Sequence, residues 1–136
     1  MSQTNQYNKN FDLIRESKAE ADRLDVLNAR LRDYFGGRIT MAPVDMSKVK
    51  SVLEVGAGSG AWTLDAATAL PNEQIVACDI APLPDAVTLP PNARFDIVDV
   101  TGPLPYEPNS FDLIHIRLLL VHVKGVPEIL SRIVAL

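Results

Sequence analysis

The sequence predicts an α/β fold in which a buried parallel sheet organises the rest of the chain. Three observations support this prediction. Short apolar segments rich in β-branched residues alternate with helical and loop segments, which is the order that parallel sheets require. A glycine-rich turn, Gly56 to Gly60, follows the first such segment and opens a helix. Charged residues stand at or near the ends of the predicted strands, where parallel sheets bind ligands.

The N-terminal part is predicted to hold one long helix. Residues 1–10 are polar and are predicted to form a flexible tail. In residues 11–35, apolar side chains recur every three or four positions with charges between them, which is typical of an amphipathic helix that covers a sheet. Gly36 and Gly37 stand where a helix C-terminal cap is expected. Residues 11–49 are therefore predicted to form an N-terminal helix and a connector.

The remaining residues, 50–136, are predicted to form the sheet and its covering helices. Helical residues 61–70 are good helix formers closed by Pro71, and Pro127 marks the first turn of a last helix. Four apolar segments are predicted to be strands: residues 51–55, 74–80, 93–100 and 111–117.

The prolines predict where the chain has loops. Most of the ten prolines lie between Pro82 and Pro108. Residues 81–92 contain four of them, so at most a short helical turn fits there, and residues 101–110 form a second proline-rich loop. Residues 118–123 are apolar and compatible with either a strand or a helix.

Composition indicates one soluble globular domain with a modest core, since 47% of the 136 residues are hydrophobic. A net charge of −4 argues against nonspecific nucleic-acid binding through a positive field. No apolar run reaches the roughly 18 residues of a membrane span, and the polar N-terminus lacks the apolar core of a signal peptide. The single cysteine, Cys78, excludes an intrachain disulfide and predicts an intracellular protein, in the cytoplasm or the nucleus.

The glycine turn and a following acid predict an adenosine-containing ligand. The segment GAGSGA satisfies the dinucleotide pattern G-x-G-x-x-G/A. Asp79 follows Gly56 by 23 residues, close to the roughly 20 expected for an acid that binds the ribose hydroxyls. These features fit both a nicotinamide dinucleotide and S-adenosyl-L-methionine.

Two further acids favour S-adenosylmethionine. Glu54 lies two residues before the first glycine, where an acid suits the cationic amino group of the methionine part and would repel a pyrophosphate. Asp99 ends the third predicted strand, where its carboxylate could accept a hydrogen bond from the adenine amino group.

The segment VLEVGAGSG resembles the first motif of class I S-adenosylmethionine-dependent methyltransferases. Over residues 19–136, successive segments resemble the fungal methyltransferase group that includes regulators of secondary metabolism. They are ADRLDVLNARLRDYFGGRI, VLEVGAGSGAWTLDAATALP, IVACDIAPLP, LPPNARFDIVDV and NSFDLIHIR. The resemblance implies a Rossmann-like sheet in the order 3-2-1-4 and methyl transfer to a small molecule or a protein.

The resemblance also implies roles for individual residues. Asp79 would hold the ribose with Ile80 against the adenine, Asp99 and Val100 would flank the adenine edge, and Arg117 would lie near the sulfonium. The turn on the methionine side would consist of Glu54, Gly56, Ala57, Gly58 and Gly60. The resemblance identifies no catalytic residue, and no Cys/His grouping has the spacing of metal ligands.

The sequence stops before the last three strands of the family's seven-stranded sheet. We therefore expect a truncated product, a fragment of a longer protein, or an incomplete sheet that a partner completes. Strand 111–117 would then be an apolar sheet edge, which favours pairing with a second copy or with another protein.

Two main functions remain open. One is the cofactor-binding part of a methyltransferase, active when completed. The other is a non-catalytic, truncated methyltransferase-like protein that acts through dimerisation or partner binding. A nicotinamide-dinucleotide-binding domain is a weaker third alternative.

Overall fold

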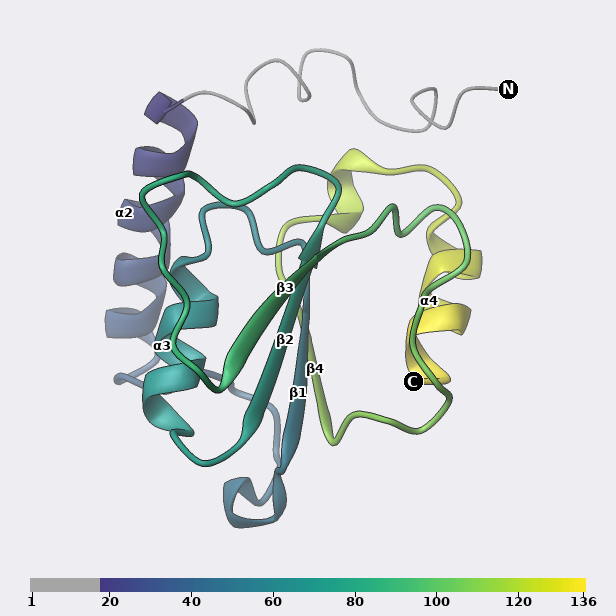
Figure 1. Cartoon of the computed structure of the whole chain (residues 1–136), viewed down its shortest axis with the longest axis horizontal. Helices are drawn as coiled ribbons and strands as arrows, with labels where there is room; N and C mark the ends of the chain where they lie inside the picture. Colours follow the sequence, from purple (N-terminus) through teal and green to yellow (C-terminus); the bar gives the residue numbers. More distant parts are fainter. Residues whose placement is uncertain (1–17) are drawn as a thin grey trace.

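The computed structural model describes residues 18–136, and a four-stranded parallel sheet in the order β3-β2-β1-β4 lies at its centre (Figure 1). The strands are β1 (Ser51–Val55), β2 (Gln74–Asp79), β3 (Ala93–Ile97) and β4 (Leu113–Ile116). All three strand pairings are parallel, and β1 lies between β2 and β4. The predicted fold class and strand order are therefore confirmed.

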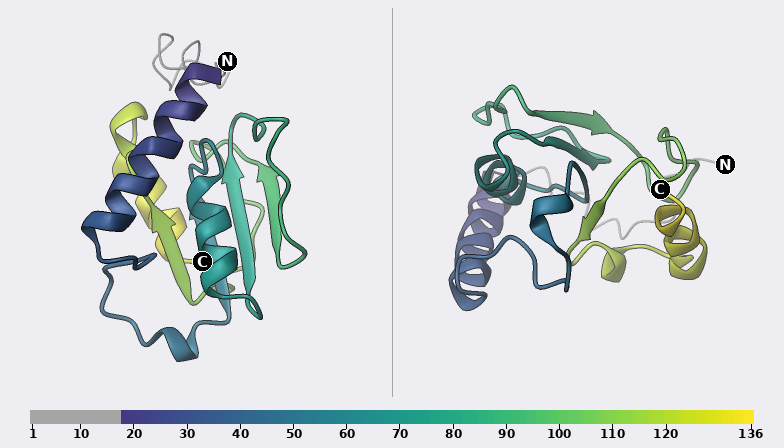
Figure 2. Two further views of the ribbon diagram at one scale, coloured as in Figure 1. Left: turned by 90° about the vertical axis from the view of Figure 1, so that its left-hand side faces the viewer. Right: turned by 90° about the horizontal axis from the view of Figure 1, so that it is seen from below.

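Helices cover both faces of the sheet (Figures 1 and 2). The helices α2 (Lys18–Tyr34) and α3 (Ala61–Ala69) lie on one side, and α4 (Val126–Val134) lies on the other. Two short 3-10 helices, η2 (Met46–Lys48) and η3 (Leu120–His122), complete the elements, and η3 shows that the ambiguous segment 118–123 is not a strand of the sheet. Among the described residues, no helix is long and apolar enough to cross a membrane.

Three strands are shorter than the sequence predicts. The strand β2 stops one residue before Ile80, β4 lacks both ends of the predicted segment 111–117, and β3 ends at Ile97 instead of residue 100. The end of β3 has a local cause, because the side chain of Asp99 accepts a hydrogen bond from the backbone N–H of Thr101 at 2.9 Å. This bond closes a turn in place of further strand pairing.

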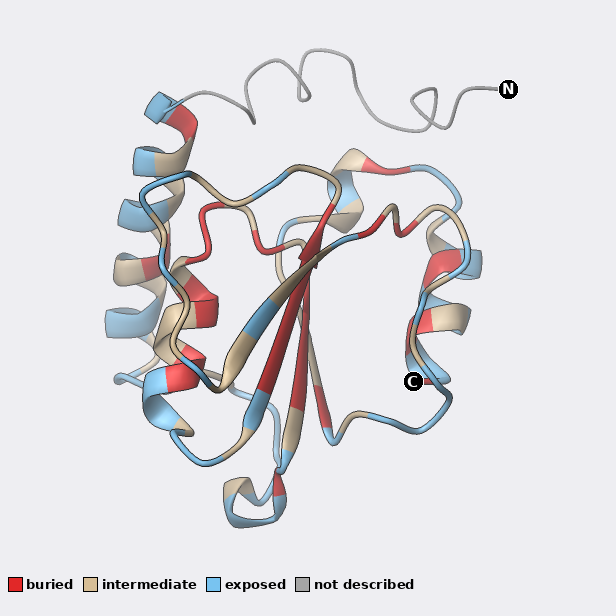
Figure 3. Ribbon diagram, viewed as in Figure 1, coloured by how far each residue is buried: buried red, intermediate tan, exposed pale blue. Residues whose placement is uncertain are grey.

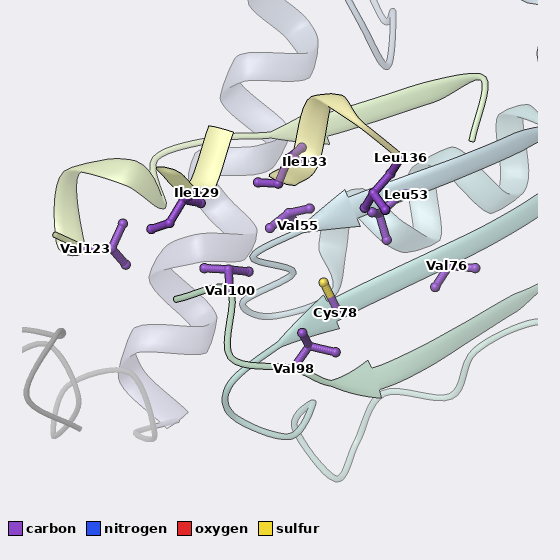
Figure 4. Close-up of a cluster of buried hydrophobic side chains, with 10 residues drawn as sticks. All are labelled: Leu53, Val55, Val76, Cys78, Val98, Val100, Val123, Ile129, Ile133 and Leu136. Carbon is purple, nitrogen blue, oxygen red and sulfur yellow. The ribbon is translucent and has the colours of Figure 1, made fainter. Parts of the chain in front are cut away.

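The core has two layers, one on each side of the sheet. The layer under α4 includes Leu53 and Cys78, packed against Ile129 and Ile133 (Figure 4). The layer under α3 includes Val52, with Trp62 and Ala66. Alternation along β1 thus places Val52 on the α3 side and Leu53 on the α4 side, as expected of a strand buried on both faces (Figure 3).

The structure describes the N-terminal helix only in part. Its predicted residues 11–17 and the tail 1–10 lie outside the described residues, and the remainder is helical to Tyr34. The predicted cap is confirmed, since Gly37 has φ +81° and its N–H donates to the carbonyl of Arg32 at 2.8 Å.

The interior face of α2 is polar where an apolar face was predicted. Its two buried residues are Glu20 and Asn28, whereas Leu24, Leu27 and Leu31 are only partly buried. The helix packs against α3. Because α3 already covers the centre of the sheet, Leu24 and Leu27 of α2 border the space above the glycine turn instead.

Candidate functional site

The turn between β1 and α3 requires glycine at three positions. Gly56, Gly58 and Gly60 have φ values of +84°, +57° and +82°, in the left-handed region that favours glycine. The N–H groups of Gly56 and Ala57 both donate to the carbonyl of Cys78, at 2.9 and 3.0 Å. These bonds anchor the turn to β2 and hold its backbone in a fixed position.

Leucine side chains from three different segments cover these glycines. A Cβ atom placed on any of the three would lie only 3.0–3.1 Å from a leucine carbon. The pairs are Gly56 with Leu119, Gly58 with Leu24, and Gly60 with Leu83. We call the turn from Gly56 to Gly60 the glycine cradle. Its three glycines carry no side chains, and a larger residue at any of them would press against the covering leucine.

Two cavities lie on either side of Gly58 and Ser59. The larger, about 890 Å³, lies between the first turns of α2, Asp79 and the loop of residues 81–87. The smaller, about 60 Å³, is bordered by Glu54, the glycine turn and Arg117. Leu24 lines both cavities. Together the two cavities extend across the turn from Asp79 to Arg117.

Glu54 is a buried acid on the α3 side of β1, only 3% exposed. Its Oε1 accepts a hydrogen bond from the hydroxyl of Thr63 at 2.6 Å. Burial raises the pKa of Glu54 to about 8, although the Thr63 hydrogen bond and the charge of Arg117 oppose this shift. The carboxyl is thus protonated at neutral pH, and a cation in the small cavity would favour its ionised form.

A Glu54→Gln variant is expected to become more stable than the wild type as the pH rises. Because the pKa of Glu54 is raised in the folded protein, unfolding releases a proton, and the wild type loses stability between about pH 5 and pH 8. Glutamine cannot ionise, yet its oxygen can still accept from Thr63. The difference in unfolding free energy between the two proteins should grow by about 3 kcal/mol over this range, measured by urea denaturation. Glu107→Gln, on an exposed loop, is the control, and a pH-independent difference for Glu54→Gln would contradict the assignment.

Asp79 connects the end of β2 to the glycine turn. Its Oδ2 accepts from the N–H of Gly58 at 2.8 Å and its Oδ1 from the N–H of Ala81 at 3.2 Å. The carboxylate borders the large cavity and is 8% exposed. Ile80, its neighbour, instead packs against the core layer under α4.

Asp99 lies in the turn after β3, so the prediction that it ends that strand is wrong. Its Oδ1 accepts from both the N–H and the hydroxyl of Thr101, at 2.9 and 2.6 Å. Its Oδ2 is buried and has no hydrogen-bond partner within residues 18–136. Val100 is buried in the core layer under α4, and its carbonyl accepts from Arg132 at 3.1 Å. Asp99 lines neither of the two cavities beside the glycine turn.

Arg117 joins a polar network that links β4, α2 and α3. Its Nη2 donates to Oδ1 of Asn28 at 2.7 Å, and Nδ2 of Asn28 donates to Asp65 at 2.8 Å. Arg32 also donates to Asp65 at 2.8 Å. Asn28 and Asp65 were missed from the sequence. One feature of the sequence could have indicated this network: Asn28 is a polar residue on the predicted apolar face of the helix.

Trp62 and His115 form a stacked pair beside the small cavity. Their rings are parallel within 1° and their centroids are 3.9 Å apart. Nε1 of Trp62 donates to the carbonyl of Ile39 at 2.8 Å. Burial lowers the pKa of His115 to about 4, so its imidazole is neutral at pH 7. The pair also lines a third cavity, of about 120 Å³, under the end of α2.

The structure brings most of the predicted residues to one place. Glu54, the glycine turn, Asp79 and Arg117 surround the two cavities on either side of Gly58, whereas Ile80 and Val100 belong to the core. The arrangement offers an acid for a cationic group, a carboxylate for hydroxyls and bare backbone between them. Within the described residues, no three Cys, His, Asp or Glu side chains group to hold a metal ion.

Known proteins share this sequence pattern. A family model described as "Methyltransferase domain" matches residues 52–136. The methyltransferase str2 of Strobilurus tenacellus is 42% identical over 119 residues, covering 88% of this chain and 42% of that protein. The secondary metabolism regulator LAE1 of Cochliobolus heterostrophus is 30% identical over 117 residues, covering 84% of this chain and 38% of that protein. The chain thus spans less than half the length of these curated relatives.

A solved structure shares the fold. The plantazolicin methyltransferase BpumL, determined in complex with SAH, superimposes with a TM-score of 0.63 at 16% sequence identity. The match covers 92% of this chain and 54% of that one. The likeness extends beyond the sheet to most of the chain.

Proposed function

The chain belongs to the methyltransferase domain family, and from this premise we propose that it binds S-adenosylmethionine across the glycine turn as part of a methyltransferase. The observation that carries the proposal is the position of Asp79, whose carboxylate lies against the backbone of Gly58 and borders the large cavity. The methyltransferase str2 and the SAH complex of BpumL support the same cofactor.

The residues present fit the two ends of this cofactor. At the adenosine end, each oxygen of Asp79 accepts one N–H and can still accept from a ribose hydroxyl. At the methionine end, Glu54 would ionise beside the ammonium group. The glycines between them let the ligand approach the backbone closely.

When bound, the cofactor supplies a methyl group on a sulfonium, from which the thioether is a good leaving group. The chain's own residues therefore mainly bind and orient the cofactor and exclude water. Glu54 and Arg117 would hold the methionine end, and Leu24 and Leu119 would cover the turn. The 120 Å³ cavity shares Arg117 with the small cavity and is the candidate entrance for a methyl acceptor, either a small molecule or a protein side chain.

Isothermal titration calorimetry of the 136-residue chain tests the proposal. We expect S-adenosylhomocysteine to bind in the micromolar range, and NADH to bind more weakly because its pyrophosphate brings no cation to the buried acid Glu54. Circular dichroism establishes that the sample is folded. A folded sample that does not bind S-adenosylhomocysteine would contradict the proposal, and tighter binding of NADH would favour the dinucleotide alternative.

A second proposed function is association through the β4 edge, as a dimer or with another protein. It is supported by the position of β4 at the edge of the described sheet, where its outer backbone groups have no neighbouring strand within residues 18–136. Val121, in η3 after β4, is an apolar side chain that is 76% exposed. Light scattering over a concentration series tests self-association, and a constant monomer mass would argue against a dimer.

A further inference from the structure

The 120 Å³ cavity under the end of α2 has an inner and an outer part. Its inner part is lined by Trp62, His115 and Arg117, which also border the small cavity at the proposed methionine end of the cofactor. Its outer part is lined by the connector after α2, residues 38–41. A molecule in this cavity would therefore face the cofactor at one end and contact the connector at the other.

Two hydrogen bonds fix this connector as the outer wall of the cavity. Gly37 adopts φ +81°, and its N–H donates at 2.8 Å to a carbonyl in the last turn of α2. The carbonyl of Ile39 accepts from Nε1 of Trp62 at 2.8 Å, which ties the connector to α3. The backbone that carries Arg38 and Thr40 is therefore fixed beside the cavity before any ligand binds.

Arg38 is an exposed cation that no acid neutralises. None of the ion pairs within residues 18–136 includes it. Arg32 also lines the cavity, but it is paired with Asp65 at 2.8 Å, and Asn28 donates to the other oxygen of that carboxylate. The planar guanidinium of Arg38 is thus free for the two-point contact that arginine makes with a carboxylate.

The remaining lining suits an aromatic ring. Phe35 and Met41 line the outer part and Trp62 lines the inner part, so apolar side chains lie at both ends. Since a cavity of about 150 Å³ is enough for a benzene molecule, the 120 Å³ here is on the scale of a single ring. The hydroxyl of Thr40 accepts from the N–H of Ala42 at 3.1 Å and can still donate to an oxygen of the ligand.

The cavities on the two sides of the glycine turn favour opposite charges. Among residues 18–136, four aspartates and one lysine line the 890 Å³ cavity, whereas three arginines and one aspartate line the 120 Å³ cavity. The imidazole of His115 adds no charge at pH 7, because burial lowers its pKa to about 4. An anion is therefore favoured in the 120 Å³ cavity and disfavoured in the cavity proposed for the adenosine.

We propose that the 120 Å³ cavity binds a small aromatic acid as the methyl acceptor, with the acid group on Arg38 and the ring against Trp62. The assignment rests on the proposed function and deepens it, because it names the chemical class of the acceptor. Arg38 would select the acceptor, whereas Arg117 would serve the cofactor. The acid group itself would not be methylated, since Arg38 does not line the small cavity at the methionine end.

An NMR titration tests this assignment with two rings of nearly equal size. Benzoate carries an acid group, whereas benzamide has a similar shape and no charge. Each is added to the ¹⁵N-labelled chain in the presence of saturating S-adenosylhomocysteine. The chain has a single tryptophan, so one indole N–H signal reports on Trp62. Benzoate should shift this signal and the amides of residues 38–41, and should bind about threefold to fivefold more tightly than benzamide, as expected for an ion pair at an exposed site.

Two variants and a salt series identify the source of this preference. Arg38→Met keeps the apolar length of the side chain and removes its charge, so the preference for benzoate should disappear. Arg30→Met is the matched control, because Arg30 is exposed on α2 and does not line the cavity, and the preference should remain. In the wild type, added NaCl should weaken the binding of benzoate and leave that of benzamide unchanged, which needs no variant to fold.

The outcomes separate this assignment from the proposed function. If S-adenosylhomocysteine binds but benzoate and benzamide bind equally or not at all, the assignment is overturned and the proposed function stands. A preference for benzoate that survives Arg38→Met, or benzoate shifts confined to the residues of the 890 Å³ cavity, would overturn it too. Tighter binding of a glutamate-rich peptide than of benzoate would overturn it in favour of a protein acceptor. A folded wild type that does not bind S-adenosylhomocysteine would contradict the proposed function, and the acceptor assignment with it.

Discussion

An Asp79→Ala variant is expected to bind S-adenosylhomocysteine at least 100-fold more weakly than the wild type. The proposed ribose contacts are two hydrogen bonds to a carboxylate, and bonds to charged groups contribute about 1.5–3 kcal/mol each. The substitution also removes the acceptors for the N–H groups of Gly58 and Ala81, so the turn itself loosens. Calorimetry gives the affinity, and thermal unfolding gives the accompanying loss of stability.

The control for Asp79 lies in the same cavity. Asp85 lines the 890 Å³ cavity but is exposed in the loop of residues 81–87, so Asp85→Asn should leave the affinity within about twofold. Asp79→Ala with wild-type affinity would show that the cofactor does not use this carboxylate. A similar loss for both variants would indicate a general effect of negative charge in the cavity.

Gly56→Ala is expected to reduce S-adenosylhomocysteine affinity at least tenfold and to destabilise the fold. The alanine must adopt φ near +84°, which costs about 1–2 kcal/mol, and its Cβ would lie 3.1 Å from Leu119. The new methyl group would also push Leu119 away from its place over the turn, beside the cavity in which the ligand would lie. Urea denaturation measures the first effect and calorimetry the second.

Gly37→Ala is a closely matched control for Gly56→Ala. Gly37 has φ +81°, but a Cβ there would meet nothing within 4 Å. It should therefore show the same backbone cost with unchanged ligand affinity. If the two variants bind S-adenosylhomocysteine equally well, the turn is not the cofactor cradle.

The centre of the fold could be predicted because residues close together in the sequence determine its strand and its turn. Strand β1 is covered on both faces, so its run of apolar residues reveals it, and the three glycines mark a turn that other residues could not adopt. The position of Asp79 followed from the same pattern. These features specify the glycine cradle without tertiary information.

The edge strands β3 and β4 were harder to predict, because local turns at their ends determine where they stop. The sequence suggested that β3 continues to residue 100, but the bonds between Asp99 and Thr101 stop it earlier. At β4, Leu118 adopts φ +61°, an unusual value for a leucine, directly after Arg117. No pattern of hydrophobicity predicts either turn.

The network around Arg117 could not be predicted because its members are distant in sequence. Asn28 and Asp65 are 37 residues apart, and Asn28 and Arg117 are 89 apart. The helical pattern of α2 predicted an apolar contact with the sheet, whereas tertiary packing placed a buried asparagine there. This polar network therefore emerges only from the folded chain.

The most direct test of the central claim is an NMR titration of the ¹⁵N-labelled chain with S-adenosylhomocysteine. If the cofactor binds across the glycine turn, the largest amide shifts should fall on Gly56, Gly58 and Ala81, with small changes on α4 across the sheet. Shifts confined to α4 or to the β4 edge, with the turn unchanged, would contradict the account.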